Sequence, residues 1–143
     1  MVILVTGGAG FIGRAVCRVL VQAGHTVRIL DDFSASMRSG LGGYEVLDGD
    51  VREPAVVREA LAGCGAVVHL AALVSVPESI RDPGLNFRLN VVATQRVAEA
   101  ARGAGVGRVV FASSAAVYGD AAPLPAGEDA PKAPISPYGA AKL

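Results

Sequence analysis

A tyrosine and a lysine near the end of the chain have the spacing of an acid–base pair. Tyr138 and Lys142 lie four residues apart, and Ser136 followed by Pro137 is a typical helix start. Residues four apart share one face of a helix. A phenol with an unperturbed pKa of about 10 is a poor base near neutral pH, but a neighbouring ammonium group favours the phenolate form. The pair could therefore exchange a proton with a hydroxyl group.

A Tyr–Lys pair at this spacing also occurs on protein surfaces without a catalytic role, so the neighbouring residues decide between the two interpretations. Ser113 and Ser114 directly follow the apolar run at 107–112. If that run is a strand of a parallel sheet, both hydroxyl groups lie at its carboxyl end, where such sheets bind their ligands. The serine hydroxyls at the end of this strand favour a reactive site over an exposed pair without a catalytic role.

A second constellation lies near the N-terminus, where four glycines follow an apolar strand. Gly7, Gly8, Gly10 and Gly13 come after the run at 2–6 and open a helical pattern. A tight turn with positive φ favours residues without a Cβ. The missing side chains also let a pyrophosphate approach the backbone, where the N-terminus of the helix binds it. A bare glycine pattern is a weak signal, but between a strand and a helix it predicts a dinucleotide-binding turn.

An acidic residue at the end of the second predicted strand supports this interpretation. The run at 26–30 leads into Asp31 and Asp32, and Asp31 follows Gly13 by 18 residues. This is close to the spacing of a carboxylate that binds the adenosine ribose hydroxyls. A carboxylate there would repel a 2′-phosphate, so we expect the cofactor to be NAD and not NADP.

Strand and helix patterns alternate along the chain. Strands are expected at 2–6, 26–30, 44–47, 66–71 and 107–112, and helices at 11–23, 53–62, 83–102 and from 136 onward. Such alternation gives parallel βαβ units with right-handed crossovers. We therefore predict an α/β fold, a three-layer α/β/α Rossmann-type doubly wound parallel sheet with strand order 3-2-1-4-5. In the first helix, apolar residues recur at helical spacing: Phe11, Ile12, Ala15, Val16, Val19 and Leu20.

Composition narrows the functional classes. Hydrophobic residues make up 52% of the 143 residues and charged residues 18%, which suits a parallel sheet buried on both faces. The net charge is zero and no basic run occurs, which argues against nucleic acid or anionic membrane as partners. Cys17 and Cys64 fit neither a metal site nor a disulfide framework, so we expect buried thiols in a reducing cytoplasm. His69, between apolar residues, is expected to be structural, and no metal site is predicted.

Taken in order, these motifs resemble those of the extended short-chain dehydrogenase/reductases, the NAD-dependent sugar-nucleotide epimerase and dehydratase family. The resemblance covers the whole chain and rests on Thr6–Gly13, Asp31, Gly49-Asp50, His69-Leu-Ala-Ala72, Asn90, Ser113–Gly119 and Ser136-Pro-Tyr-Gly-Ala-Ala-Lys142. Within the family, the segment 71–79 and the loop at 123–129 look most like UDP-hexose 4-epimerases.

The resemblance implies roles for individual residues. Tyr138 would be the base, Lys142 would bridge the nicotinamide ribose, and Ser114 would bind the reacting sugar hydroxyl. Asn90 would mainly organise the backbone behind the fourth strand. Ser75, Ser79 and Arg81 could reach a substrate. Cofactor contacts are expected from Gly7, Gly10, Phe11, Ile12, Gly13, Asp31, Asp32, Asp50, Val51, Leu70, Ala71, Ala72, Asn90, Tyr138 and Lys142.

The implied function is 4-epimerisation of a UDP-hexose or UDP-N-acetylhexosamine through a transient 4-keto intermediate, in a cytoplasmic homodimer. Dimers of the family pair the long helix, here 83–102, with the Tyr–Lys helix. The alternatives are a sugar-nucleotide dehydratase or reductase, and a non-catalytic NAD-binding module. Similar 4,6-dehydratases carry an Asp-Glu pair where this chain has Ala115 and Ala116. Because methyl groups cannot transfer protons, dehydration by that mechanism is disfavoured.

The last predicted helix has barely begun when the sequence reaches Leu143, and no helix-stop residue lies nearby. We therefore expect residues 1–143 to be the N-terminal, NAD-binding part of a longer protein, truncated after the fifth strand. The resemblance implies that a C-terminal domain, absent here, holds the nucleotide sugar. The 143-residue chain alone is expected to show no turnover.

Overall fold

The computed structural model describes residues 1–120 and 124–143. Pro123, the first residue of the loop at 123–129 that the family resemblance used, therefore lies outside the described residues. The chain forms two compact units. Unit 1 comprises residues 1–71 and 93–111, and unit 2 comprises residues 72–92 and 112–143.

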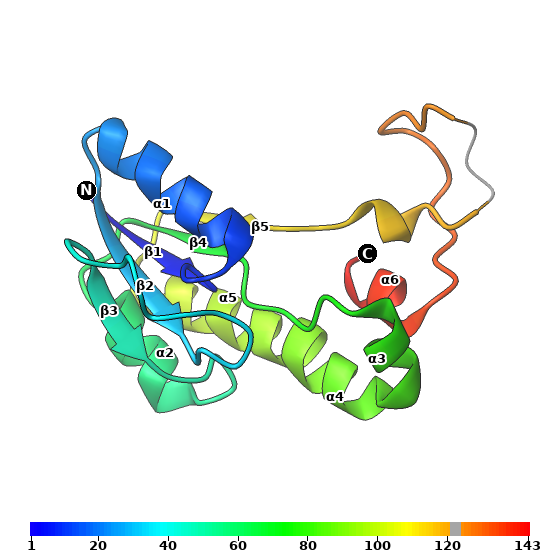
Figure 1. Ribbon diagram of the computed structural model, residues 1–143, viewed down its shortest axis with the longest axis horizontal. Coiled ribbons are helices and arrows are strands. Elements are labelled where there is room, and N and C mark those ends of the chain that lie inside the picture. Colours follow the sequence, from blue (N-terminus) through cyan, green and yellow to red (C-terminus); the bar gives the residue numbers. More distant parts are fainter. Residues whose placement is uncertain (121–123) are drawn as a thin grey trace. The chain divides into compact units, whose positions relative to one another are not determined.

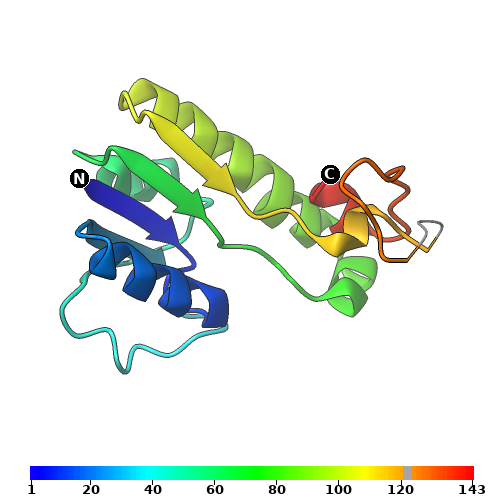
Figure 2. The same cartoon turned by 90° about the horizontal axis from the view of Figure 1, so that it is seen from above.

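Unit 1 contains a five-stranded parallel sheet with the strand order β3-β2-β1-β4-β5 (Figure 1). Its strands are β1 (Val2–Thr6), β2 (Thr26–Asp31), β3 (Glu45–Asp48), β4 (Ala66–His69) and β5 (Arg108–Phe111). The arrows of β1, β4 and β5 point the same way in Figure 2, so their carboxyl ends meet at one edge. The predicted fold class and strand order are confirmed.

Helices cover both faces of this sheet. α1 (Phe11–Gln22) lies on one face, and α2 (Pro54–Leu61) and α5 (Ala93–Gly103) lie on the other (Figure 1). Successive strand residues point to opposite faces, so Leu4 packs in the α2–α5 core and Val5 in the α1 core. This double cover explains the high apolar content, because the central strands are buried on both sides. β5 is the exception, with all its residues exposed.

The long helix expected at 83–102 is divided. The structure has α4 (Pro83–Phe87), a π-helical segment η1 (Arg88–Val92) and then α5. The carboxylate of Asp82 caps α4 by accepting the N–H of Leu85 at 2.8 Å. A π-helical segment adds a residue to a turn and often marks a functional position.

Unit 2 also contains a helix that was not predicted, α3 (Val76–Arg81). The hydroxyl of Ser75 accepts the N–H of Glu78 at 3.2 Å and caps this helix. The unit is completed by a short 3-10 turn, η2 (Ala115–Val117), and by α6 (Pro137–Ala141). Among the described residues, no helix is long and apolar enough to cross a membrane.

Candidate functional site

The glycine-rich turn of unit 1 is built from close backbone contacts. Gly7 has φ +68, and its N–H donates to the carbonyl oxygen of Leu30 at 2.8 Å. A Cβ at Gly7 would lie 2.7 Å from the backbone nitrogen of Ala71. A Cβ at Gly13 would lie 2.2 Å from the carbonyl oxygen of Gly7. Only glycine fits at both positions, so the turn presents bare backbone at the carboxyl end of the sheet.

The N-terminus of α1 follows this turn. Gly10 is the N-cap residue and makes no side-chain hydrogen bond to the helix. The first N–H groups of a helix have no partner within the helix, so those of α1 can bind an anion. Phe11 and Ile12 are 96% and 62% exposed. Their side chains therefore lie on the surface beside the turn, and their cofactor contacts stay predictions.

Asp31, the last residue of β2, links the turn to the following loop. Its Oδ2 accepts the N–H of Ala9 at 2.9 Å, and its Oδ1 accepts the N–H of Phe33 at 3.0 Å and the hydroxyl of Ser36 at 2.8 Å. A carboxylate has about four lone-pair sites. Three are used by these donors, so one remains for a donor such as a ribose hydroxyl.

The residues after Asp31 are also held by local contacts. Asp32 Oδ1 accepts the N–H of Ser34 at 3.0 Å and its hydroxyl at 2.6 Å. Phe33 has φ +56, which is rare for a residue with a side chain. The guanidinium of Arg38 lies 4.0 Å from the centre of the Phe33 ring and also pairs with Asp48. Contacts within the protein therefore shape this loop.

Asp50 and Val51, expected beside the adenine, have different surroundings. Asp50 accepts hydrogen bonds from the backbone N–H and the Nε of Arg52, both at 2.7 Å. These hydrogen bonds to Arg52 lower the pKa of the Asp50 carboxyl below its usual range. The side chain of Val51 is buried in the core. A ligand contact of Val51 would therefore come from its backbone.

A buried threonine organises the backbone after β4. Thr6 Oγ1 accepts the N–H groups of Leu70 and Ala71, both at 3.2 Å. It also lies 2.6 Å from Nδ1 of His69. Since two donors already point at the hydroxyl, its own proton goes to Nδ1, which places the ring proton on Nε2, 3.1 Å from Thr94 Oγ1. His69 is thus a hydrogen-bonded core residue, and sequence reasoning overlooked Thr6.

In unit 2, α6 carries the candidate base. The N–H of Tyr138 donates to the hydroxyl of Ser79 at 3.1 Å, and the carbonyl of Pro137 accepts from Nδ2 of Asn86 at 2.9 Å. The hydroxyl of Ser136 caps the helix by accepting the N–H of Gly139 at 3.0 Å, as predicted. Two contacts from α3 and α4 therefore fix the start of α6.

These contacts correct the interpretation of Ser79 as a possible substrate contact. Ser79 is fully buried, and its hydroxyl donates to the carbonyl of Val76 at 2.7 Å while it accepts from Tyr138. Its hydroxyl is therefore structural. Ser75 caps α3 and is half-buried, so a substrate contact of Ser75 stays a prediction. Asn86 was missed altogether, because its partner lies 51 positions away.

Asn90 makes the backbone contacts that the resemblance implied. It is 1% exposed and lies in η1. Its Oδ1 accepts the N–H of Leu73, and its Nδ2 donates to the carbonyl of Leu73, both at 2.9 Å. The same Nδ2 donates to Oδ1 of Asn86 at 2.8 Å. A chain of amide groups therefore joins the segment after β4, which includes Ala72, to the start of α6.

Lys142 lies directly after α6 and is 4% exposed. Burial disfavours its charged form and lowers the pKa of the ammonium group. The backbone carbonyl of Lys142 accepts the hydroxyl of Ser113 at 2.8 Å. Ser114 Oγ accepts the N–H of Ala116 at 3.2 Å and starts η2. Unit 2 thus contains the three predicted catalytic residues.

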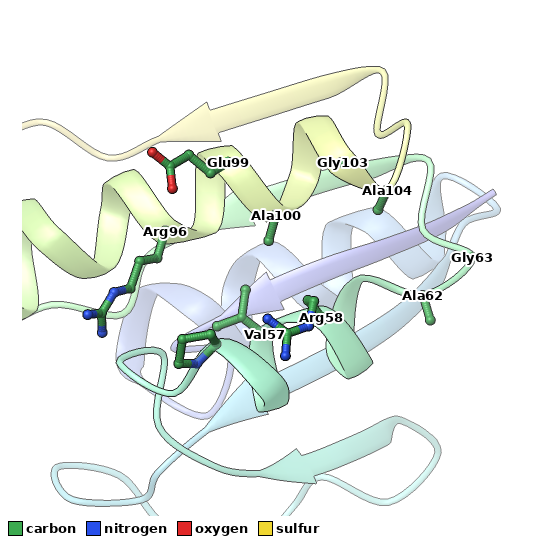
Figure 3. A pocket seen from close by; sticks show the side chains of 10 residues that line it. Val57, Arg58, Ala62, Gly63, Arg96, Glu99, Ala100, Gly103 and Ala104 are labelled. Atoms are coloured by element: carbon green, nitrogen blue, oxygen red, sulfur yellow. The ribbon is translucent and has the colours of Figure 1, made fainter.

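A groove lies away from these residues. It has a volume of about 790 Å³ and runs between α2 and α5 on unit 1 (Figure 3). Val57 and Ala100 form its apolar wall, with Arg58, Arg96 and Glu99 around it. None of the predicted site residues lines it. In the described part of the chain, no group of three or more His, Cys, Asp or Glu residues could hold a metal ion.

Known proteins with similar sequences agree with a dinucleotide-binding fold of this kind. Residues 3–143 match the model of the "NAD dependent epimerase/dehydratase family". The chain is 42% identical over 144 residues to a UDP-glucose 4-epimerase of Streptomyces lividans, a match that covers 98% of this chain and 44% of the relative. The chain therefore spans less than half the length of this curated relative.

Solved structures with the same fold include two with different reactions in their names. A UDP-glucose 4-epimerase from Brucella ovis in complex with NAD has a TM-score of 0.94 and 36% identity, and covers 99% of this chain and 44% of its own. An NAD-dependent NDP-hexosamine 5,6-dehydratase has a TM-score of 0.87 and 38% identity, and covers 99% and 46%. The likeness thus extends across more than one reaction type.

Proposed function

The chain belongs to the NAD dependent epimerase/dehydratase family, and we propose that it is the N-terminal part of a longer nucleotide-sugar 4-epimerase. The observation that carries the proposal is the complete Ser114, Tyr138 and Lys142 set in unit 2, in which Tyr138 lies on a helix whose start is fixed by Ser79 and Asn86. A module that only binds NAD has no need of such a proton-transfer set. The alternative class, a non-catalytic binding module, is therefore less well supported.

The residues of unit 1 fit a dinucleotide. Gly7 and Gly13 leave bare backbone at the turn, and the uncapped N-terminus of α1 suits a pyrophosphate. Asp31 retains a lone pair for an adenosine ribose hydroxyl. Its negative charge disfavours a 2′-phosphate, so the fit is better for NAD than for NADP. The remaining cofactor contacts named from the sequence stay predictions.

When bound, the cofactor would accept a hydride from the sugar and give it back, which is the chemistry needed to change the configuration at a sugar carbon. Tyr138 as phenolate removes the proton from the C4 hydroxyl of the sugar and later returns it. Ser114 holds that hydroxyl through a hydrogen bond. Lys142 stabilises the phenolate and contacts the nicotinamide ribose. Oxidation to the transient 4-keto form would also remove the hydride from C4, and its return to the opposite face of C4 would invert the configuration while the proton returns to the same oxygen, so no group is gained or lost.

Two neighbouring reactions within the family are less well supported. Elimination of water needs an acid–base pair beside the reacting carbons. The residues after Ser114 are Ala115 and Ala116 in η2, whose methyl groups cannot transfer protons. A dehydrogenase would release NADH in each cycle and a reductase would release NAD⁺, so either would need a second substrate to regenerate the cofactor. A dehydratase with another acid–base pair is the runner-up.

The experiment incubates the full-length enzyme with UDP-glucose, UDP-N-acetylglucosamine or one of their 4-epimers, and follows the anomeric protons by NMR. Interconversion of the epimers without net NADH formation supports the proposal. Stoichiometric NADH release or a 4-keto-6-deoxy product would overturn it. Absence of any reaction, together with tight NAD binding, would favour the binding module.

We further propose that the full-length enzyme is a cytoplasmic homodimer. Support for a reducing compartment comes from Cys17 and Cys64, which are both buried and unpaired as disulfides. Burial raises the pKa of the Cys17 thiol to about 11 and also raises that of Cys64. Such thiols resist oxidation.

The helical segment at 83–103 and α6 are the proposed dimer elements. Light scattering of the full-length enzyme tests whether it is a dimer.

A further inference from the structure

One arginine connects the glycine-rich turn to the loop at 33–43, which we name the adenosine-side loop. Arg14 stands directly after Gly13, in the first turns of α1. Its Nε donates to the carbonyl of Ala9 in the turn at 2.7 Å. Its Nη1 donates to the carbonyl of Ser39 at 2.8 Å, and its Nη2 donates to the carbonyl of Met37. One guanidinium thus connects the turn to the loop, two segments that α1 and β2 separate in the sequence.

The adenosine-side loop has one other anchor in its middle, Arg38, but its contacts with Phe33 and Asp48 do not join the loop to α1. Ser36 is held by Asp31, and Leu41 is buried in the α1 core. Between them, the side chain of Met37 is 73% exposed, so packing does not fix this stretch. Its two carbonyl bonds to Arg14 are therefore what holds the middle of the loop against α1.

The contacts form a closed circuit around the proposed ribose position. Ala9 donates its N–H to Asp31 and accepts from Arg14 with its carbonyl. Asp31 holds the start of the loop, and Arg14 holds its middle. The circuit sets the distance between the carboxylate of Asp31 and the N-terminus of α1. These are the two groups to which the proposed function assigns the ribose and the pyrophosphate.

We propose that Arg14 is a positioning residue that presets the adenosine half of the cofactor site and so determines how tightly the cofactor is retained. The inference rests on the proposed function, since an epimerase that regenerates its cofactor in every cycle gains from slow release. We call the hydrogen bonds from Arg14 to Met37 and Ser39 the clamp. Without the clamp, the loop would become ordered only when the cofactor binds, and the entropic cost of that ordering would weaken binding. No contact between Arg14 and the cofactor is needed.

A simpler role for Arg14 is attraction of the pyrophosphate by its charge. The two roles make different predictions for lysine, which keeps the charge but lacks the planar fork of donors. Arg14→Lys retains binding if charge matters, and loses most of it if the clamp matters. Arg14→Gln removes both. Arg18, one turn along the same helix, is exposed and makes no hydrogen bond or ion pair with other described residues, so Arg18→Gln is the matched control.

The loop side offers an independent variant pair. Gly40 and Gly43 both have positive φ, at +74 and +94. A Cβ at Gly40 would lie 3.3 Å from Nη1 of Arg14, whereas a Cβ at Gly43 would meet nothing within 4 Å. Gly40→Ala and Gly43→Ala therefore impose similar backbone strain, but only the first displaces the guanidinium.

The experiment uses the full-length enzyme freed of cofactor, with hydrogen exchange and with calorimetric titration of NAD and of 5′-AMP, which lacks the nicotinamide half. Arg14→Gln is expected to speed exchange at 37–41 with β1 still protected, and to weaken NAD and 5′-AMP equally, by about 10- to 100-fold. Arg14→Lys should show most of the loss of affinity seen in Arg14→Gln, and Gly40→Ala should lose more affinity than Gly43→Ala. Arg18→Gln should bind as the wild type does.

Three results would overturn the proposal. Wild-type affinity in Arg14→Lys would show that the charge of Arg14 is responsible for the effect. Unchanged hydrogen exchange at 37–41 in Arg14→Gln would show that Arg14 does not hold the loop. Equal losses of affinity in Gly40→Ala and Gly43→Ala would show that the effect does not act through the guanidinium. A full-length wild-type enzyme that binds neither ligand overturns the proposed function together with this role. That outcome differs from failure of the clamp alone, because the exchange comparison needs no cofactor.

Discussion

The backbone N–H of Tyr138 donates a hydrogen bond to the hydroxyl oxygen of Ser79 at 3.1 Å, across 59 positions of the chain. Ser79 has no exposed surface, and its own proton goes to the carbonyl of Val76. The position of the proposed base is therefore set by a buried side chain in a helix that was not predicted. This contact and that of Asn86 fix α6 from two sides.

Ser79→Ala should reduce catalysis more than it reduces folding. The change leaves the N–H of Tyr138 without its acceptor, and a lost neutral hydrogen bond of this kind costs about 1 kcal/mol. In the full-length enzyme we expect kcat to fall about tenfold with little change in KM, because a displaced base is felt in the transition state. Ser75→Ala, which removes the cap of α3, should cost about 1 kcal/mol of stability without the same loss of kcat. Equal kcat values for the two variants would contradict this prediction.

Asp31→Asn should change which cofactor binds. The variant removes the charge that disfavours a 2′-phosphate, while its single amide oxygen can still accept a hydrogen bond from Ala9 or from Phe33, which donate to different oxygens of Asp31. Titration of NAD and NADP by calorimetry should show that NAD binds less tightly and that the preference for NAD over NADP falls about tenfold. The ratio of the two affinities is insensitive to any loss of folded protein. Equal affinities for NAD and NADP in the wild type would refute the role of Asp31.

The stability of the chain should decrease in alkaline solution because of Cys17. Burial raises the pKa of this thiol from 9.0 to about 11, so the folded chain keeps a proton that the unfolded chain releases. The free energy of unfolding therefore falls as the pH rises from about 9 to about 11, by up to roughly 2.7 kcal/mol. The pKa of the buried Lys142 is lowered, which acts in the opposite direction below the ordinary lysine pKa of about 10.4.

Cys17→Ala isolates the thiol contribution. Urea unfolding of both proteins, under reducing conditions and at several pH values, gives the difference in their free energies of unfolding. The cavity left by the thiol contributes equally at every pH, so only the slope reports the titration. A difference that stays constant from pH 9 to 11 would show that the folded thiol titrates normally.

Sequence patterns predicted the parts of the fold that depend on local chemistry. The parallel strand order followed from alternating strands and helices, and the cap at Ser136 from one serine before a proline. The cap of α3 could have been predicted as well, because Ser75 and Glu78 have the spacing of a capping box. The missed helix was therefore visible in the sequence.

Other features depend on partners that are distant in the chain. Thr6 and Ser79 owe their roles to residues more than 50 positions away, and sequence periodicity carries no trace of such contacts. The π-helical segment around Asn90 interrupts a pattern that reads as one helix. Phe11 has the spacing of a core residue, yet it is 96% exposed because it lies at the helix end beside the bare turn. Local rules fail at the places where a ligand is proposed to bind.

Tyr138→Phe should remove proton transfer and leave the structure of the site intact. The backbone N–H at this position still donates to Ser79, and the cap from Ser136 does not involve the side chain. In the full-length enzyme we expect kcat for epimer interconversion to fall about 10²- to 10⁴-fold, the usual loss when a general base is removed. The affinity for NAD should stay within about threefold of the wild type, because phosphate and adenosine contacts contribute most of the binding. An NMR assay of interconversion and a calorimetric titration on the same preparation test both expectations. Activity within tenfold of the wild type would show that another group removes the proton, and would make Tyr138 a positioning residue of the substrate.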